Sequence, residues 1–191
     1  MCLMKPPHLL SITNTAPTSL SSSSLVSQGD TSSGKSSLLS SIAMVELPSA
    51  SELTTRCPIE LKMRKAEVRQ AVVTVKWRED AHTKPEFQAM KVDTDNWNKL
   101  SSAISKAQDH VMGQAKGNVS RDMVIVAVEG PMYIDLTLVD LPGIVRSVAK
   151  DESSTLCEEI DALINDYLKN KRCVILAVVP ANVDFHNSQV S

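Results

Sequence analysis

The residues best suited to chemistry form a short loop that is bounded by two glycines and carries a single lysine. The loop fits the pattern GxxxxGK[ST] and consists of Gly29, Asp30, Thr31, Ser32, Ser33, Gly34, Lys35 and Ser36, with Ser37 next in the chain. Glycines let successive backbone N–H groups converge on a phosphate, and the N-terminus of a following helix adds a partial positive charge. The pattern predicts that residues 29–37 bind nucleotide phosphates, that Lys35 reaches the β- and γ-phosphates, and that the Ser36 hydroxyl ligates Mg²⁺. A flexible Ser/Gly linker is the alternative, but an amphipathic helix is predicted directly after the loop.

A second candidate site is a carboxylate that follows an apolar run. Residues 134–139 predict a strand, and the next residues are Asp140, Leu141, Pro142 and Gly143. In a nucleotide-binding α/β sheet the Mg²⁺ shell lies at the carboxyl ends of the strands. We expect Asp140 to bind this Mg²⁺ through a water molecule and the Gly143 N–H to meet the γ-phosphate. A simple Asp-Pro-Gly turn is the alternative, but the two motifs together favour a P-loop nucleoside triphosphatase.

The elements that must position these residues are predicted from hydrophobic periodicity. Helices are expected at residues 35–44, 94–112 and 152–168. Strands are expected at residues 25–28, 58–63, 68–77, 123–128, 134–139 and 173–179, the last as a buried run. Apolar strands that alternate with helices indicate an α/β sheet of the parallel type, covered on both sides. Leu38, Leu39 and Ile42 are expected to share one face of the first helix.

Composition and charge exclude several classes of protein. The 191 residues are 42% hydrophobic and 22% charged, with a formal net charge of −2, so no basic surface for nucleic acid is indicated. The four cysteines and four histidines are dispersed without metal-ligand spacing, which disfavours structural zinc, a disulfide framework and a metal hydrolase. No apolar run approaches the roughly 20 residues of a membrane-spanning helix.

Residues 1–28 differ in composition from the rest of the chain. This segment is rich in Ser and Thr and contains one Lys and no acidic residue. We predict that residues 1–28 are disordered, because such a segment buries too little apolar surface to offset its ordering entropy; a transit peptide is the weaker alternative. Residues 29–191 are predicted to form part of a single domain whose chain is truncated on the C-terminal side.

Four ordered motifs resemble those of the dynamin superfamily of large GTPases. Residues 29–37 are similar to its phosphate loop, residues 47–48 and 55–61 to its first switch, residues 140–144 to its second switch, and residues 178–184 to the segment before its base-recognition strand. The Thr-Arg-Cys-Pro form at residues 55–58 is most similar to Mx-like members. The resemblance implies a dynamin-type G domain, a P-loop fold with a mixed, mostly parallel sheet between helices, and hydrolysis of GTP to GDP and phosphate.

The resemblance also implies roles for individual residues. Ser36 and Thr55 would be the Mg²⁺ ligands, with Asp140 acting through water. Ser32, Thr55 and Gly143 would position the attacking water, and Ser32 would help to place a monovalent cation, K⁺ or Na⁺. No residue is identified as a strong general base, which suits a reaction that depends on positioning and electrostatics.

Three features depart from the family's pattern. Thr31 stands where the family usually has Gln, and Ala50 and Glu52 replace two glycines whose backbone conformation a side chain restricts. The strand at residues 25–28 is short and polar for a central position, which is expected to weaken the sheet beside the phosphates. The sequence also stops before the Thr-Lys-Pro-Asp motif that reads guanine, so GTP rather than ATP is implied by the resemblance alone, and the isolated chain is expected to have little GTPase activity.

Two other functions stay open, and partners follow from the resemblance only. The favoured interpretation is that the chain is part of an active GTPase. The first alternative is a truncated, catalytically silent fragment of such a GTPase, and the second, less favoured, is another P-loop ATPase. The family implies self-association of G domains and binding to microtubules or membranes in full-length members, in a cytoplasmic setting. Nucleic acid is not an expected partner.

Overall fold

The computed structural model describes residues 24–29, 33–48, 56–78, 83–92, 98–115, 117–143, 154–169 and 173–179. These stretches contain seven strands and three helices. The strands are β1 (Ser24–Gln28), β2 (Ile59–Lys65), β3 (Gln70–Lys76), β4 (Met90–Val92), β5 (Met123–Gly130), β6 (Leu136–Asp140) and β7 (Cys173–Ala177). The helices are α1 (Lys35–Ala43), α2 (Asn98–Met112) and α3 (Ser154–Leu168). All seven strands join one sheet, in the order β4-β3-β5-β2-β6-β1-β7.

The sheet is mixed, as predicted. Parallel pairs are β1/β6, β1/β7 and β2/β5, and antiparallel pairs are β2/β6, β3/β4 and β3/β5. Parallel pairs are thus not in the majority among the described strands. Two of the antiparallel pairs, β2/β6 and β3/β5, follow from the short connections at residues 66–69 and 131–135, since a parallel crossover needs a dozen or more residues and shorter links reverse the chain.

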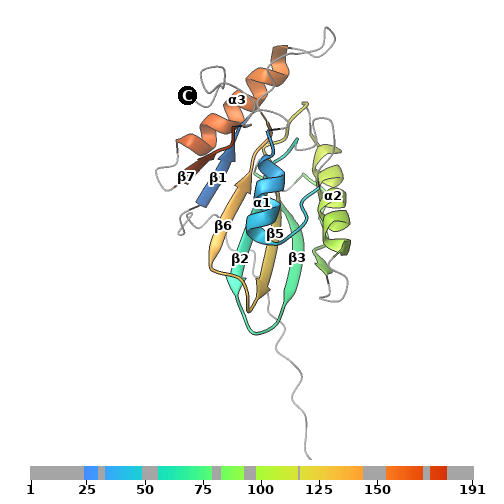
Figure 1. Ribbon diagram of the computed structural model, residues 1–191. Coiled ribbons are helices and arrows are strands. Elements are labelled where there is room, and N and C mark those ends of the chain that lie inside the picture. Colours follow the sequence, from blue (N-terminus) through green and yellow to red (C-terminus); the bar gives the residue numbers. More distant parts are fainter. Residues whose placement is uncertain are drawn as a thin grey trace, which may run out of the picture.

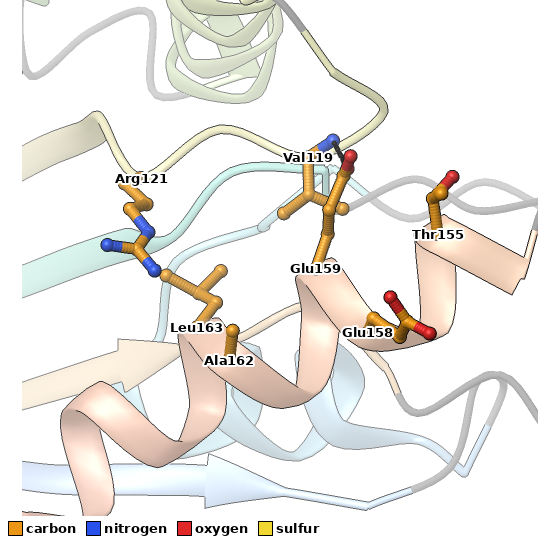
Figure 2. Close-up of a pocket in the computed structure, with 7 residues that line it drawn as sticks. All are labelled: Val119, Arg121, Thr155, Glu158, Glu159, Ala162 and Leu163. Atoms are coloured by element: carbon orange, nitrogen blue, oxygen red, sulfur yellow. Dashed lines mark hydrogen bonds between the residues drawn. The ribbon is translucent and has the colours of Figure 1, made fainter.

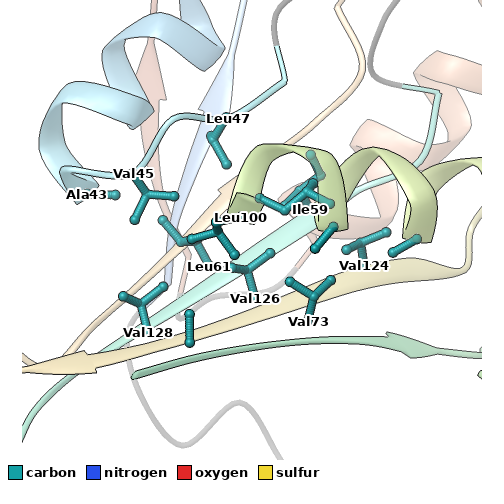
Figure 3. Packing of buried hydrophobic residues seen from close by; sticks show 14 of the residues in the cluster. Ala43, Val45, Leu47, Ile59, Leu61, Val73, Leu100, Val124, Val126 and Val128 are labelled. Atoms are coloured by element: carbon teal, nitrogen blue, oxygen red, sulfur yellow. The ribbon is translucent and has the colours of Figure 1, made fainter. Parts of the chain in front are cut away.

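Two apolar cores lie on opposite faces of the sheet. On one face, α1 and α2 cover β2, β3, β5 and the Leu138 side of β6; Figure 1 shows α1 in front of the sheet and α2 at the right, beside β3. Figure 3 shows Leu100 of α2 packed among strand residues such as Leu61 and Val126. On the other face, α3 packs on Val26 and Val139. Alternate side chains of β5 and β6 therefore contribute to both cores.

The helical stripes of α2 and α3 agree with prediction. Buried side chains of α2 include Leu100, Ile104, Ala107 and Val111, as expected. Buried side chains of α3 are Leu156, Ile160, Leu163, Ile164 and Tyr167, also as expected. Burying a large aliphatic side chain contributes about 1.5–3 kcal/mol, so these stripes account for the docking of both helices. None of the helices in the described residues is long and apolar enough to cross a bilayer.

Some expectations were wrong in position or burial. On α1, Leu39 is buried, whereas Leu38 and Ile42 are 38% and 40% exposed, because α1 rests on the sheet by a narrower face than the stripe predicted. The run at β7 is not buried, since Val174 and Ile175 are 57% and 48% exposed. β7 is the last strand in the sheet order, so one of its edges meets no described strand.

The strand expected at residues 25–28 is present as β1, so these residues do not share the disorder expected of residues 1–28. Residues 24–28, assigned to the Ser/Thr-rich segment, form β1. The rest of that segment, residues 1–23, lies outside the described residues, as do residues 93–97 at the expected start of the second helix. The three-residue β4 was missed because it is too short to show a period.

Candidate functional site

The phosphate-loop motif begins where β1 ends against the end of β7. A Cβ added at Gly29 would lie 2.4 Å from the carbonyl oxygen of Val178 and 2.9 Å from Oγ of Ser33. The Val178 N–H donates to the carbonyl of Gln28 at 2.8 Å, which holds the two strand ends together. Gly29 is therefore required by close packing of the backbone, independently of any ligand.

The same motif closes with the start of α1. Gly34 has φ 92° and ψ 15°, a left-handed conformation that favours glycine, and its carbonyl accepts the N–H of Leu38 at 2.9 Å. No side chain caps this end of α1 among the described residues. The first amides of the helix thus have the orientation and partial positive charge that bind an anion.

Lys35, the cation of the loop, is held close to the backbone. Its side chain is buried, with the residue only 6% exposed, and Nζ donates to the carbonyl of Gly29 at 3.1 Å. This contact spans the loop from its last residues to its first. The charged amine of Lys35 therefore lies against the first residue of the loop and is shielded from solvent.

The carboxylate of Asp140 joins the second motif to the first. Asp140 is 2% exposed; its Oδ2 accepts the Ser36 hydroxyl at 2.7 Å, and its Oδ1 accepts the Ser27 hydroxyl at 3.0 Å. Burial raises the pKa of this carboxyl group, opposed by the hydrogen bonds from Ser36 and Ser27 and by the charge of Lys35. The two sequence motifs are thus in direct contact.

The oxygen atoms of Ser36 and Asp140 fit a magnesium ion. Mg²⁺ prefers oxygen ligands and is usually held by one or two protein groups together with waters and substrate phosphates. In the part of the chain that the structure describes, no three His, Cys, Asp or Glu side chains cluster as a metal site. A hydroxyl and a carboxylate in contact suit an ion that also takes ligands from a phosphate.

The other predicted site residues differ in burial, and several lie outside the described part of the chain. Leu141 is buried in the core beneath α3, Pro142 is buried and Gly143 is half-buried. Ser33 Oγ is buried without a partner among the described residues, and Ser37 is exposed, with its carbonyl accepting the Ser41 hydroxyl at 3.1 Å. The residues outside the described part of the chain are Asp30, Thr31, Ser32, Ala50, Glu52 and Thr55.

Sequence reasoning missed one residue of the site, Ser27. It was treated as a weakness of a short polar strand, yet its hydroxyl contacts Asp140. The signal was present in the sequence as a polar residue two positions before Gly29 in a strand expected to be central. The sequence could not identify Asp140 as the partner of Ser27, because the pairing depends on the register of β1 against β6.

A pocket of about 370 Å³ lies elsewhere, between α3 and the loop before β5. It is lined by Val119, Arg121, Thr155, Glu158, Glu159, Ala162 and Leu163. Figure 2 shows Glu159 turned toward the loop backbone, where its carboxylate accepts the N–H groups of Asn118 and Val119 at 3.1 and 3.2 Å. None of the lining residues belongs to either phosphate-site motif, and two carboxylates disfavour a phosphate ligand. We therefore place the candidate nucleotide site at the phosphate loop.

Comparison with known proteins gives a single answer. The profile described as "Dynamin family" matches residues 25–191. The interferon-induced GTP-binding proteins Mx2 and Mx1 of Oncorhynchus mykiss are 36% and 35% identical to this chain over 161 residues, which is 84% of the chain and 24% of each relative. Interferon-induced GTP-binding protein Mx1 of Mus musculus is 34% identical over the same shares. The chain thus spans about a quarter of the length of these relatives.

Proposed function

Because the chain belongs to the dynamin family, we propose that its phosphate loop binds GTP with Mg²⁺ and that the site serves hydrolysis of GTP to GDP and phosphate. Relatives at 36% and 35% identity are named GTP-binding proteins, which supports a guanine nucleotide as the ligand. The observation that carries the proposal is the 2.7 Å contact between Ser36 Oγ and Asp140 Oδ2. It joins the two motifs between which a nucleotide and its metal would lie.

Each residue has a separate task in this proposal. Lys35 would contact the β- and γ-phosphates as a cation, while backbone N–H groups of residues 29–36 would bind further phosphate oxygens. Mg²⁺, when bound, supplies neutralisation of the charge on the β- and γ-phosphate oxygens. Ser36 and Thr55 would be its ligands, and Asp140 would hold it through water.

Hydrolysis also requires a water molecule in line with the γ-phosphate. Ser32, Thr55 and Gly143 are the proposed positioning residues, by analogy with the family. The proposal needs no strong base among them, because phosphoryl transfer is accelerated mainly by positioning and electrostatic stabilisation. A monovalent cation, K⁺ or Na⁺, is the second proposed cofactor, and the departures at Ala50 and Glu52 are expected to weaken its binding.

The test is binding of a fluorescent, non-hydrolysable GTP analogue to the 191-residue chain, with Mg²⁺ or with EDTA. We expect Mg²⁺-stimulated binding that excess GTP displaces and that Lys35→Ala abolishes, because the substitution removes the cation of the loop. Lys99→Ala, which removes an exposed lysine on α2, is the matched control and should bind normally. Displacement by ATP more readily than by GTP would favour the P-loop ATPase alternative. No binding by the parent chain would favour the silent fragment.

Thr55 is tested by comparing nucleotides. If Thr55 contacts Mg²⁺ in the triphosphate state, Thr55→Ala should weaken binding of the triphosphate analogue much more than binding of GDP, since the first switch closes on the γ-phosphate. Equal weakening of both nucleotides would remove Thr55 from this role.

The geometry of the site does not bear on partners or cellular location, so both are proposed from the family. Self-association of G domains, and contact of the full-length protein with membranes or microtubules, are proposed from the family alone, as is a cytoplasmic location. Sedimentation of the chain with and without the GTP analogue tests self-association. Fractionation of cells that express the tagged chain tests location.

A further inference from the structure

We propose that Ser27 is a positioning residue for Asp140, holding one oxygen of the carboxylate so that the other faces Ser36 and the metal side of the site. The inference rests on the proposed function, because it assigns a task toward Mg²⁺ and nucleotide. Neither the phosphate-loop pattern nor the second motif includes this residue.

The geometry of the two strands fixes this contact. Ser27 and Asp140 are directly paired across the parallel strands β1 and β6, and they are 0% and 2% exposed. Ser27 Oγ lies 3.0 Å from Asp140 Oδ1 and 3.3 Å from the carbonyl oxygen of Val139. A carboxylate is the stronger acceptor when ionised, and it is also the nearer one. The hydroxyl therefore donates to Asp140.

Both oxygens of the carboxylate have a hydroxyl partner, and the two partners come from different elements. Ser36 in α1 donates to Oδ2 at 2.7 Å, while Ser27 in β1 donates to Oδ1. An apolar side chain at position 27 would leave Oδ1 buried without this donor, at a cost in desolvation. It would also free the carboxylate to rotate, so that fewer molecules present Oδ2 to the metal side.

A second serine of the same strand provides a natural comparison. Ser24 is 2% exposed, but its hydroxyl has no partner among the described residues. Ser24→Ala and Ser27→Ala thus make the same chemical change in the same strand, and only the second removes a donor to Asp140.

The first experiment measures affinity for the fluorescent GTP analogue with Mg²⁺ and with EDTA, and compares the ratio of the two dissociation constants. Ser27→Ala should lower the Mg²⁺ enhancement about tenfold, the usual effect of one hydrogen bond to a charged group. Ser27→Thr, which keeps the hydroxyl, should retain most of the enhancement, and Ser24→Ala should retain all of it. An unchanged ratio in Ser27→Ala would overturn the inference.

The second experiment needs no nucleotide. A double-mutant cycle of Ser27→Ala and Asp140→Ala, measured by urea unfolding without Mg²⁺, should show coupling of about tenfold in the unfolding equilibrium constant. The same cycle with Ser24→Ala should show none. Absence of coupling at Ser27 would overturn the contact, whereas a parent chain that fails to bind the analogue would overturn the proposed function while coupling is still present.

Discussion

Gly29 lies so close to Val178 that a Cβ on the glycine would stand 2.4 Å from the Val178 carbonyl oxygen. The first residue of the phosphate loop is therefore packed against the backbone of the residue that follows β7, far downstream in the sequence. Since β7 pairs with β1 along its whole length, the position of the loop depends on β7 as well as on β1. The loop pattern consists of adjacent residues, but the position of the loop in the fold depends on a strand that is distant in the sequence.

Gly29→Ala should destabilise the fold by about 1–3 kcal/mol, the usual cost of overpacking, because the nearest atom belongs to backbone that cannot rotate away. Urea unfolding measures the change in the free energy of unfolding. Gly113→Ala, where the nearest atom would be 3.3 Å away, is the control and should cost clearly less. Equal losses at both positions would contradict the close fit at Val178.

Asp140→Asn should stabilise the nucleotide-free chain at neutral pH while it abolishes Mg²⁺-stimulated binding. Burial raises the pKa of Asp140 above its ordinary value of 3.8, so the folded state binds this proton more tightly than the unfolded state. Stability of the parent then falls as the pH rises through the folded-state pKa, and the penalty is absent below about 3.8.

The measurement is urea unfolding in EDTA from about pH 4 to about pH 8. The advantage of Asp140→Asn over the parent should grow with pH. An advantage that shrinks as the pH rises would show that the carboxylate is stabilised, not strained, by its surroundings.

Glu159→Ala should loosen the loop before β5 and lower the free energy of unfolding by about 1 kcal/mol, since two backbone N–H groups lose a charged acceptor. Hydrogen exchange should become faster at the amides of Asn118 and Val119, which donate to Glu159. The neighbouring Glu158 is exposed and lines the same pocket, so Glu158→Ala is the matched control. Faster exchange in both variants would argue against a specific contact.

Cys57 should resist alkylation in the folded chain. It is fully buried, and burial raises its pKa to about 12, so the reactive thiolate is scarce near neutral pH. Mass spectrometry after iodoacetamide treatment should find modification of Cys57 only in urea, and Cys157, which is half-buried, should react earlier. Rapid labelling of Cys57 without denaturant would show that the segment after Thr55 opens readily.

Local patterns in the sequence were enough to predict that both motifs follow strands and which sides of α2 and α3 are buried. The glycine spacing of residues 29–34 and the carboxylate after an apolar run depend on backbone freedom and on strand ends, and both are properties of adjacent residues. The stripes of α2 and α3 follow from a period of 3.6, so their buried sides were readable without knowledge of their neighbours.

Neighbour order and register were decided only by the tertiary structure. Val174 and Ile175 are exposed because β7 lies at the end of the described sheet. An apolar run in the sequence does not show where its strand lies within a sheet. The contact of Ser27 with Asp140 spans 113 positions in the chain and exists because β1 and β6 pair in one register. Periodicity specifies which face of an element is apolar, but the partner that covers it is chosen by packing of the whole chain.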